Sequence, residues 1–481
     1  MSKALQITFC SGVGAVTGAN FLLEREGSQE NDFANNSKIL VDCGMMQGER
    51  FDEEKNREPF PYNPVSIQAL IVTHAHLDHI GRIPKLVKEG FHGVIYSTPQ
   101  TKELAELVLT DAAGILALEA RQDGVAPLFD LNDIRVVFLL WRTIRYHENL
   151  EIVPGISILL KDAGHILGSA MVEISAQVRK RASTQDGSDT NLIRILFTGD
   201  LGNSPAPLLQ DTESIGDIDY LIMESVYGDR NHESKEQRVS EFERVIKKTI
   251  AYAGTLVIPT FSIDRTQVLL YELNNMVEQK KIPSIPIFVD SPMAIKATKI
   301  YAENTDLFND YVRNQIAKGD DIFDFKNLEF IMSQNESRDI DKIKGAKIIL
   351  AGSGMSVGGR VTGHEETYLP DSKNTILLVG YQTVGSLGRR LADGAKKVHI
   401  HKQKVQIHAR IEKLYGYSAH KDSDHLLGFV SNATNRLKQV FVTMGEPKAS
   451  MFLAQKINEE LKVKAVVPKI GDKVNLQSIE V

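Results

Sequence analysis

Three imidazoles and one carboxylate lie within six residues of the sequence. The segment directly follows the apolar run Ala69–Val72, and its ligand-type side chains are His74, His76, Asp78 and His79. So dense a cluster between an expected strand and an expected helix is typical of a metal site rather than of chance packing. His74 and His76 can share one side of an extended strand end, and the other two can face a second position beyond the turn. The spacing therefore predicts two adjacent cations.

Four residues cannot complete two coordination shells, so further ligands are expected at other strand ends. His165 lies in the Gly-containing segment Asp162–Ser169, where glycines let the backbone come close to a metal. Asp200 follows the β-rich run Ile193–Phe197, and a carboxylate at that place can bridge two ions. A turn histidine and a helix-capping aspartate are the alternatives. Because the first cluster is present, we interpret both residues as ligands.

The chemistry of this residue set is that of a hydrolase. Imidazoles and carboxylates without thiolate favour Zn, and Mn is the alternative in an oxygen-richer second position. Paired metals about 3.5 to 4 Å apart acidify a bridging water and hold the oxygens of an in-line displacement. The expected reaction is hydrolysis, most naturally of a phosphodiester or an acyl bond.

The elements that must position these residues belong to an α/β fold. In the first half, apolar runs of β type alternate with amphipathic helical segments, at 6–9, 19–23, 39–42, 69–73, 80–88 and 101–118. The polar segments Glu26–Lys38 and Arg179–Asn191 are interpreted as loops. A second block, 236–382, alternates helices with strands and so implies parallel βαβ units. Its polar part, Lys318–Asp341, predicts no clear element.

Composition excludes several classes of protein. The chain has 481 residues, of which 42% are hydrophobic and 25% charged, and its net charge is -6, so the overall field does not attract nucleic acid or anionic lipid. No apolar run is long enough to span a membrane and no signal peptide is evident. Two cysteines, Cys10 and Cys43, cannot form a disulfide framework and are expected to be buried. These features predict a cytoplasmic protein without membrane partners.

The metal-type residues match a known pattern. His74-x-His76-x-Asp78-His79, then His165 and Asp200, resemble the metallo-β-lactamase superfamily, as do the early segments Thr17–Gly18 and Val41–Gly44. The resemblance implies an αββα sandwich with the metals at its edge. Since the superfamily includes lactamases, glyoxalases and nucleases, membership alone does not decide the substrate.

The rest of the chain resembles the β-CASP nucleases, in particular the mRNA 3′-end-processing and bacterial ribonuclease branch. The segments that carry the resemblance are Met223–Arg230, Pro259–Gln267, Asp290–Ala294, Gly352–Met355, Gly358–Arg360, Gly380–Gln382 and Tyr417–Asp422. It implies a lactamase-like domain at 1–228 and 418–481, with an inserted α/β β-CASP domain at 229–417 that contains a mainly parallel sheet. RNA or DNA would be held between the two.

The resemblance also implies roles for single residues. Glu224 and His420 would form a hydrogen-bonded pair that passes a proton to the leaving oxygen, and Asp78 would share in catalysis beside the metals. The alternatives are a strand-end carboxylate and a loop histidine. The candidates for contact with the phosphate backbone are Arg265, Ser353, Arg360 and His364, although each can equally be structural.

One position departs from the family. Family members that act on RNA carry a third signature histidine that binds the second metal, and Met444 stands at that place here. A thioether is a poor ligand for such ions, so the second site would keep Asp78, His79 and Asp200 and lose one donor. Three outcomes stay open: water completes the shell, one metal binds, or the chain is a slow or inactive homologue.

The predicted function is a metal-dependent ribonuclease that hydrolyses single-stranded RNA by a metal-activated water, as an endonuclease, a 5′-exonuclease or both, in RNA processing or decay. The first alternative is a degenerate homologue that binds RNA or a partner subunit. A DNA-acting nuclease is the second, since family members that resemble the DNA-repair nuclease Artemis also lack the third histidine. A small-molecule hydrolase is less favoured, because the inserted domain would cover the metal edge. A homodimer is left open.

Overall fold

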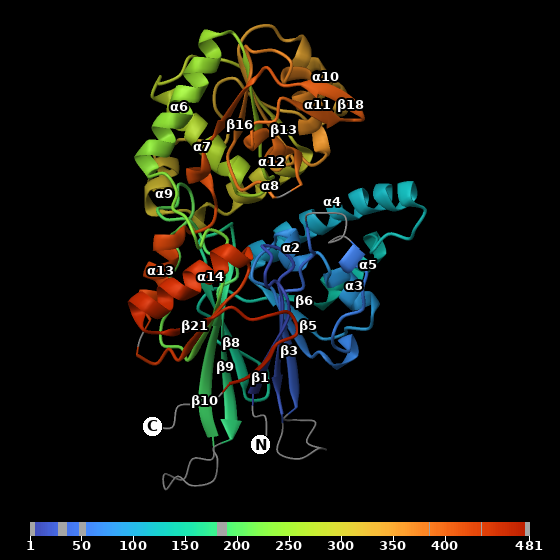
Figure 1. Cartoon of the computed structure of the whole chain (residues 1–481), viewed down its shortest axis with the longest axis vertical. Coiled ribbons are helices and arrows are strands. Elements are labelled where there is room, and N and C mark those ends of the chain that lie inside the picture. Colours follow the sequence, from blue (N-terminus) through green and yellow to red (C-terminus); the bar gives the residue numbers. More distant parts are fainter. Residues whose placement is uncertain are drawn as a thin grey trace. The chain divides into compact units, whose positions relative to one another are not determined.

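The computed structural model describes residues 5–26, 36–47, 54–179, 190–383, 385–433 and 435–476 of the chain. The chain divides into two compact units, drawn in Figure 1. The first unit comprises residues 1–204, 211–231 and 420–481, and the second comprises 205–210 and 232–419. The second unit is therefore inserted into the sequence of the first. Within the described ranges, no helix combines the length and apolar character that crossing a membrane requires.

The first unit contains two seven-stranded sheets. One has the order β22-β1-β2-β3-β4-β5-β6, with bounds β1 Leu5–Ser11, β2 Asn20–Arg25, β3 Ser37–Val41, β4 Ala69–Ile71, β5 Val94–Ser97, β6 Trp141–Thr143 and β22 Lys473–Asn475. The other has the order β21-β20-β11-β10-β9-β8-β7, with bounds β7 Leu150–Val153, β8 Ile156–Asp162, β9 Ala170–Arg179, β10 Thr190–Phe197, β11 Tyr220–Met223, β20 Gln439–Val442 and β21 Lys464–Val466.

Each of these sheets contains a parallel run of strands. Strands β3, β4, β5 and β6 are parallel in the first sheet, and β10, β11, β20 and β21 are parallel in the second. The carboxyl ends of parallel strands meet at one edge of a sheet. Residues that directly follow these strands are therefore brought together, although they lie far apart in the sequence.

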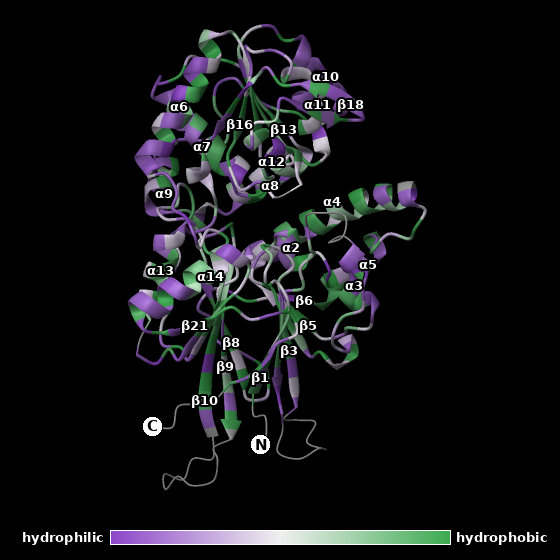
Figure 2. Ribbon diagram, viewed as in Figure 1, coloured by the Kyte–Doolittle hydropathy of each residue, from purple (hydrophilic) through white to green (hydrophobic). Residues whose placement is uncertain are grey.

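The main core of the first unit takes apolar side chains from both sheets. Phe9 of β1 contacts Phe441 of β20 with ring centroids 5.3 Å apart, and Phe21 of β2 contacts Phe197 of β10 at 5.9 Å. Figure 2 shows the hydrophobic residues along these strands. Both cysteines are buried and unbridged, so that prediction is confirmed.

Six α-helices accompany the sheets of the first unit in the described residues. They are α2 Leu77–Ile80, α3 Ile83–Lys88, α4 Pro99–Asp123, α5 Leu131–Leu140, α13 Ser423–Ser431 and α14 Pro447–Lys456. The helix expected over 80–88 is confirmed from Ile83 onward as α3, but its start is wrong, because Ile80 is the last residue of α2, Gly81 caps that helix, and α3 begins anew with Pro84 in its first turn. The helix expected over 101–118 is confirmed within the longer α4. It begins at the N-cap Thr98 and ends at Gly124, whose φ is 69°.

The second unit is built on a six-stranded sheet of order β14-β13-β15-β12-β16-β19. All of its strand pairs are parallel, which confirms the prediction of a parallel sheet in this block. The strands are β12 Thr255–Pro259, β13 Ile287–Asp290, β14 Leu328–Phe330, β15 Lys347–Ala351, β16 Thr375–Leu378 and β19 Arg410–Lys413, and a separate hairpin consists of β17 Lys397–Ile400 and β18 Gln403–Gln406. The α-helices are α6 Lys235–Ala251, α7 Arg265–Glu278, α8 Pro292–Glu303, α9 Asp310–Ala317, α10 Gln334–Asp339, α11 Gly359–Tyr368 and α12 Leu387–Ala392.

Segments expected to lack regular structure are partly ordered. The polar segment 318–341 contains the edge strand β14 and the helix α10, both too short and too exposed to leave a periodic pattern in the sequence. Most of the two predicted loops, residues 27–35 and 180–189, lies outside the described residues. Their described ends are partly wrong, because Ser37 and Lys38 belong to β3, Arg179 to β9, and Thr190 and Asn191 to β10. The prediction for residues 27–35 and 180–189 stays untested.

Candidate metal centre and active site

Most of the predicted metal ligands, and Glu224, directly follow the parallel strands described above. His74 and His76 lie just after β4, Asp200 after β10 and Glu224 after β11. His165 lies between β8 and β9, on a turn whose backbone is fixed when the His165 N–H donates to Ser169 Oγ at 3.0 Å. The first unit thus brings together residues that are separated by up to 150 positions in the sequence.

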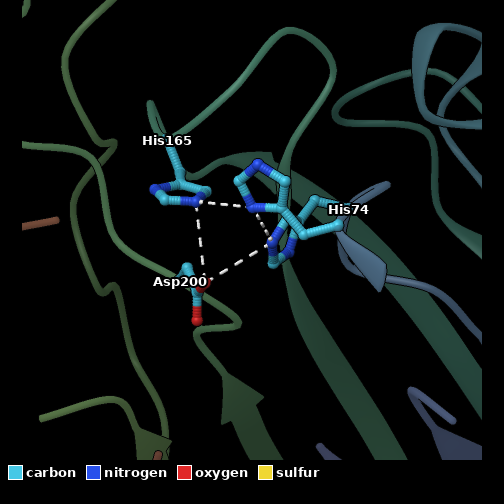
Figure 3. Close-up of side chains that lie close together, drawn as sticks. His74, His165 and Asp200 are labelled. Atoms are coloured by element: carbon cyan, nitrogen blue, oxygen red, sulfur yellow. Dashed lines mark hydrogen bonds and ion pairs between the residues drawn. The ribbon is translucent and has the colours of Figure 1, made fainter. Parts of the chain in front are cut away.

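The first group of potential ligands consists of His74, His76, His165 and Asp200, whose ligand atoms all lie within 4.8 Å of one another. Asp200 Oδ2 is 3.5 Å from His74 Nε2 and 3.6 Å from His165 Nε2. Figure 3 shows His74, His165 and Asp200 pointing toward a common centre. Three nitrogens and one carboxylate oxygen form the donor set of a four-coordinate divalent ion.

A second group shares Asp200 with the first. It consists of Asp78, His79 and Asp200. His79 Nε2 lies 3.4 Å from Asp200 Oδ1 and 3.9 Å from Asp78 Oδ2. Within the described part of the chain, His79 Nε2 and Asp200 Oδ1 are buried and make no hydrogen bond. Buried polar atoms without such a partner are rare in proteins, and a cation between the two would satisfy both.

Burial prepares the first group for a metal. It lowers the pKa of His74, and it lowers the pKa of His76 and His165 well below the usual value of an imidazole. Burial alone would raise the pKa of Asp200, but the neighbouring His79 and His74 outweigh it and hold that pKa well below its usual range. Neutral imidazoles and an ionised carboxylate are the protonation states that bind metals. The residues present therefore fit a divalent cation.

Two residues outside the predicted set, Asp42 and Thr73, hold the site in place. Asp42 Oδ1 accepts a hydrogen bond from the Thr73 N–H at 2.8 Å, and Asp42 Oδ2 accepts one from Thr73 Oγ1 at 2.8 Å. His79 Nδ1 lies 2.7 Å from Asp42 Oδ2, so Asp42 orients this imidazole. The available sequence signal was an aspartate directly after an apolar run, the same signal that identified Asp200.

Glu224 and His420 form a pair beside the metal-type groups. His420 Nδ1 is 3.2 Å from Glu224 Oε1, which also accepts from the Leu201 N–H at 2.6 Å. Burial raises the pKa of Glu224, and the neighbouring His420 opposes part of the rise. Burial alone would lower the pKa of His420, but the Glu224 carboxylate outweighs it and the pKa rises to about 9. Both shifts are upward, so the pair favours holding a proton.

Comparison with known proteins gives three family matches along the chain. Residues 32–182 match the metallo-beta-lactamase superfamily domain, residues 266–391 the Beta-Casp domain, and residues 404–468 the Zn-dependent metallo-hydrolase RNA specificity domain. The chain is also 33% identical over 407 residues to Ribonuclease TTHA0252 of Thermus thermophilus, a match that covers 85% of this chain and 88% of that protein. The chain belongs to the β-CASP family of the metallo-β-lactamase superfamily.

Other relatives of this β-CASP chain carry a different name. It is 30% identical to the transcription termination factor FttA of Methanosarcina mazei, over 89% of this chain and 66% of that protein. It is 30% identical to FttA of Pyrococcus abyssi, over 99% of this chain and 72% of that protein. The β-CASP chain thus spans roughly two thirds of the length of these FttA relatives.

Met444, at the place where the family resemblance implies a third histidine, is buried at 2% exposure. It has a φ of 45°, and its N–H donates to Gly12 O at 2.8 Å. A Cβ on Gly12 would come within 2.8 Å of Met444 Sδ and 3.0 Å of the Ala19 Cα atom. The Ala19 N–H in turn donates to Asp78 O at 2.9 Å. Gly12 and Ala19 therefore connect Met444 to Asp78 of the second group. The thioether of Met444 adds no hard donor to that group.

The four candidates for RNA contact lie in the second unit, and most are engaged with protein atoms. Arg265 is buried and its Nη1 donates to Val379 O. Arg360 Nη1 donates to Asp290 Oδ1 at 2.6 Å, and His364 Nε2 lies 2.6 Å from Asp290 Oδ2. Ser353 Oγ accepts from the Val357 N–H at 3.0 Å. A buried carboxylate thus holds two of these residues, and the role of all four in RNA binding stays a prediction.

Proposed function

We propose that this β-CASP protein is a metal-dependent ribonuclease that hydrolyses phosphodiester bonds of single-stranded RNA. The observation that carries the proposal is the pair of potential metal groups that share Asp200, next to the Glu224–His420 pair. The RNA specificity domain match over 404–468 and the ribonuclease relative support RNA as the substrate. The FttA relatives, named as transcription termination factors, support a place in RNA processing.

Two zinc ions, with Mn as the alternative, are proposed as the cofactors. The first would be held by His74, His76, His165 and Asp200, and the second by Asp78, His79 and the shared Asp200. When bound, such ions would supply acidification of a water and stabilisation of the charge that develops on phosphate oxygens. Because Met444 replaces a ligand, the second ion is expected to bind more weakly than the first.

Side chains of the protein would donate the proton that the leaving group needs. With Nδ1 of His420 held by Glu224, the opposite ring nitrogen, Nε2, is the atom that would donate to the leaving oxygen. Glu224 keeps the imidazole protonated and fixes its orientation, as the raised pKa of His420 indicates. Asp78 would take part by holding the second ion.

The proposed domain boundaries are those that the sequence predicts. An αββα metallo-β-lactamase domain would consist of residues 1–228 and 418–481, with the β-CASP domain inserted at 229–417. The ends of the two compact units, at 231 and 420, lie within three residues of these limits and support them. In the inserted domain, Ser353 and Arg360 are proposed to contact phosphate, whereas the buried Arg265 and His364 would shape that surface from beneath.

The decisive experiment separates metal binding from proton transfer. Asp200→Ala should remove most bound metal and abolish cleavage of an end-labelled single-stranded RNA. Glu224→Gln and His420→Ala should keep the metal and lose the rate. Asp219→Asn is the matched control, because Asp219 is equally buried in the first unit and bonds Arg194 and Arg436 instead. Cleavage that survives the loss of Asp200 would defeat the proposal.

A second candidate function is favoured by Met444 alone. A chain that lacks one ligand of the second ion could bind RNA or a partner subunit with little turnover. This reading predicts one metal per chain, tight RNA binding and no cleavage by the wild-type protein. A parallel assay on single-stranded DNA decides whether the substrate is RNA or DNA.

A further inference from the structure

The hairpin formed by β17 and β18 in the second unit is strongly basic, and we call residues 396–406 the basic hairpin. Between Asp393 and Glu412 the sequence contains no acidic residue. The same stretch contains five lysine or arginine residues and three histidines, namely Lys396, Lys397, His399, His401, Lys402, Lys404, His408 and Arg410. The whole chain, in contrast, has a net charge of -6. The positive charge is therefore a property of this surface and not of the overall composition.

The two faces of the basic hairpin differ in character. The strands are antiparallel, and Lys397 pairs with Gln406 while His399 pairs with Lys404. All four residues are exposed, and they share one face because cross-strand partners point to the same side of a sheet. The opposite face belongs to the core of the second unit through three buried side chains, Val398, Ile400 and Val405. The cationic face is therefore carried by an element that is packed firmly in place.

The lysines of the basic hairpin do not balance their charge within the fold. All four are exposed, and none forms an ion pair with another residue in the described part of the chain. Lys397 and Lys404 are diagonal neighbours across the strand pair, about 7 to 8 Å apart, so their charges repel each other. Such lysines contribute nothing to the stability of the hairpin through charge. An anionic ligand is the partner that would compensate them.

The turn of the basic hairpin places two basic residues where other residue types are preferred. His401 and Lys402 have φ values of 47° and 67°. Two-residue hairpin turns with positive φ at both positions favour Asn-Gly, because most other side chains are strained there. His401 has a role in the fold, since its Nδ1 lies 2.8 Å from Glu366 Oε2 and its Nε2 lies 3.3 Å from Thr362 Oγ1. Among the described residues, no such contact accounts for Lys402.

The contacts of His401 place the turn against α11. Thr362 and Glu366 lie three and seven residues after Gly359, the first residue of α11, so the turn lies about 5 to 11 Å along the helix axis from that start. Figure 1 shows β18 close to α11 in the second unit. Ser353 and Arg360, the proposed phosphate contacts, lie at the same start, and Ser353 N is 3.2 Å from the place that a Cβ of Gly359 would take. An RNA strand that extends along α11 from this start would reach the basic hairpin.

We propose that the basic hairpin is an additional RNA-binding surface, which binds the phosphate backbone of the substrate outside the nucleotides that are cleaved. This inference rests on the proposed ribonuclease function and adds a surface that the function itself does not require. Lysine ammonium groups bind phosphates as point charges and carry no sequence information, so the surface strengthens the binding of long RNA equally for all sequences. The match to the RNA specificity domain begins at 404, within β18, which favours RNA over anionic lipid as the partner.

The first test uses a substitution with opposite effects on stability and on RNA binding. Lys402→Gly should leave the melting temperature unchanged or raise it, because glycine suits the positive φ of this position. The loss of one cation should weaken the binding of a long, fluorescently labelled oligouridylate and reduce the slope of log K against log salt by about 0.7. Fluorescence anisotropy measures this binding, and a chelator in the buffer prevents cleavage.

Lys280→Gly is the matched control for this test. Lys280 is also an exposed lysine of the second unit with a positive φ, of 54°. It follows α7, which leads to the amino end of β13, whereas Ser353 follows the carboxyl end of β15. These ends lie at opposite edges of a parallel sheet. The control should therefore change stability in the same direction as Lys402→Gly and leave RNA affinity and its salt dependence unchanged.

The second test separates charge from structure on the exposed face. The double variant Lys397→Gln, Lys404→Gln should reduce the salt slope by about 1.4, equally for oligouridylate and oligoadenylate. The double variant Lys397→Arg, Lys404→Arg keeps both charges and should keep the binding of the wild type.

Four results would each overturn the proposal: an unchanged salt slope in the glycine and glutamine variants, an equal loss in Lys280→Gly, a loss in the arginine variant as large as in the glutamine variant, or lysine-dependent binding to phosphatidylserine vesicles with unchanged RNA binding. Wild-type protein that binds RNA through these lysines, but never cleaves it once metal is supplied, would instead defeat the proposed ribonuclease function and support this surface.

Discussion

Asp42→Asn tests the role of a buried carboxylate that lies outside the potential metal groups. Asp42 receives three hydrogen bonds, two from Thr73 and one from His79 Nδ1. An asparagine of the same shape keeps one oxygen, which can still accept from the Thr73 N–H. Its amide NH₂ then takes the place of Oδ2 and meets His79 Nδ1 as a donor, so Nδ1 must become the acceptor. The ring proton would move to Nε2, the nitrogen that faces Asp200.

The size of the effect follows from that tautomer change. An imidazole with a proton on Nε2 cannot donate its lone pair to an ion at the second position, whereas the first group, with His74, His76 and His165, is untouched. Removal of such an orienting partner costs about 10- to 100-fold in metal affinity, or about 1.4 to 2.8 kcal/mol. The loss should fall on one ion only. Cleavage should decrease in parallel, and excess metal should restore it in part.

Competition with a chromophoric chelator measures both affinities in one titration. The wild type is expected to release two ions in distinct steps, and Asp42→Asn should shift only the weaker step. Asp219→Asn serves again as the control for a buried Asp to Asn change, and its two steps should match the wild type. Two steps of unchanged affinity in Asp42→Asn would refute the view that Asp42 sets the tautomer of His79.

Two further variants probe the departure from the family and an unusual carboxyl group. Met444→His should raise occupancy of the second metal, because histidine tolerates the positive φ of this position and supplies the absent donor, whereas Met444→Leu should change nothing. Equal metal content in both variants would contradict the assignment. Burial raises the pKa of Glu365 to about 7, from 4.5, and Ser356 Oγ donates to this side chain at 2.5 Å. In the folded chain the Glu365 carboxyl group keeps its proton at a pH where the same group of the unfolded chain has lost it. The free energy of unfolding therefore falls as pH rises from about 4.5 to 7, by on the order of 3 kcal/mol. Glu365→Gln should unfold at a higher temperature than the wild type at pH 8 and at a similar one at pH 5, and equal pH profiles would exclude the effect.

Much of the metal centre could be predicted from the sequence because its residues carry their own local signal. His74, His76, Asp78 and His79 are adjacent in the chain, and His165 and Asp200 are marked by glycines or by a preceding apolar strand. The positions after parallel strands then meet at one sheet edge, as elementary sheet geometry requires. No knowledge of side-chain contacts is needed for that step.

The orienting roles were harder to predict, because Asp42 carries the same local signal as Asp200, an aspartate directly after an apolar run, but that signal does not identify its partners. Asp42 precedes the histidine-rich segment by some thirty positions, and only the pairing of β3 with β4 places it beside Thr73. The burial of Arg265 and the contact of His364 with Asp290 likewise depend on tertiary packing within the second unit. In the sequence, a basic side chain in a family motif predicts a contact with phosphate. In the fold, the same side chain can instead bind a buried carboxylate.

Asp200 occupies a special place among these residues, because it belongs to both potential metal groups and its carboxylate also lies within 4.8 Å of ligand atoms of Glu224 and His420. Its carboxylate follows a strand of one sheet, whereas His74 and His79 follow a strand of the other. The centre therefore exists only when the two sheets of the first unit pack together, so metal affinity and the stability of that packing are linked. Replacement of Asp200 removes the ligand that both metal groups share, and unfolding separates the two sheets that carry the ligands. Metal should accordingly raise the thermal stability of the wild type and leave Asp200→Ala unchanged, a difference that can be measured without any assay of catalysis.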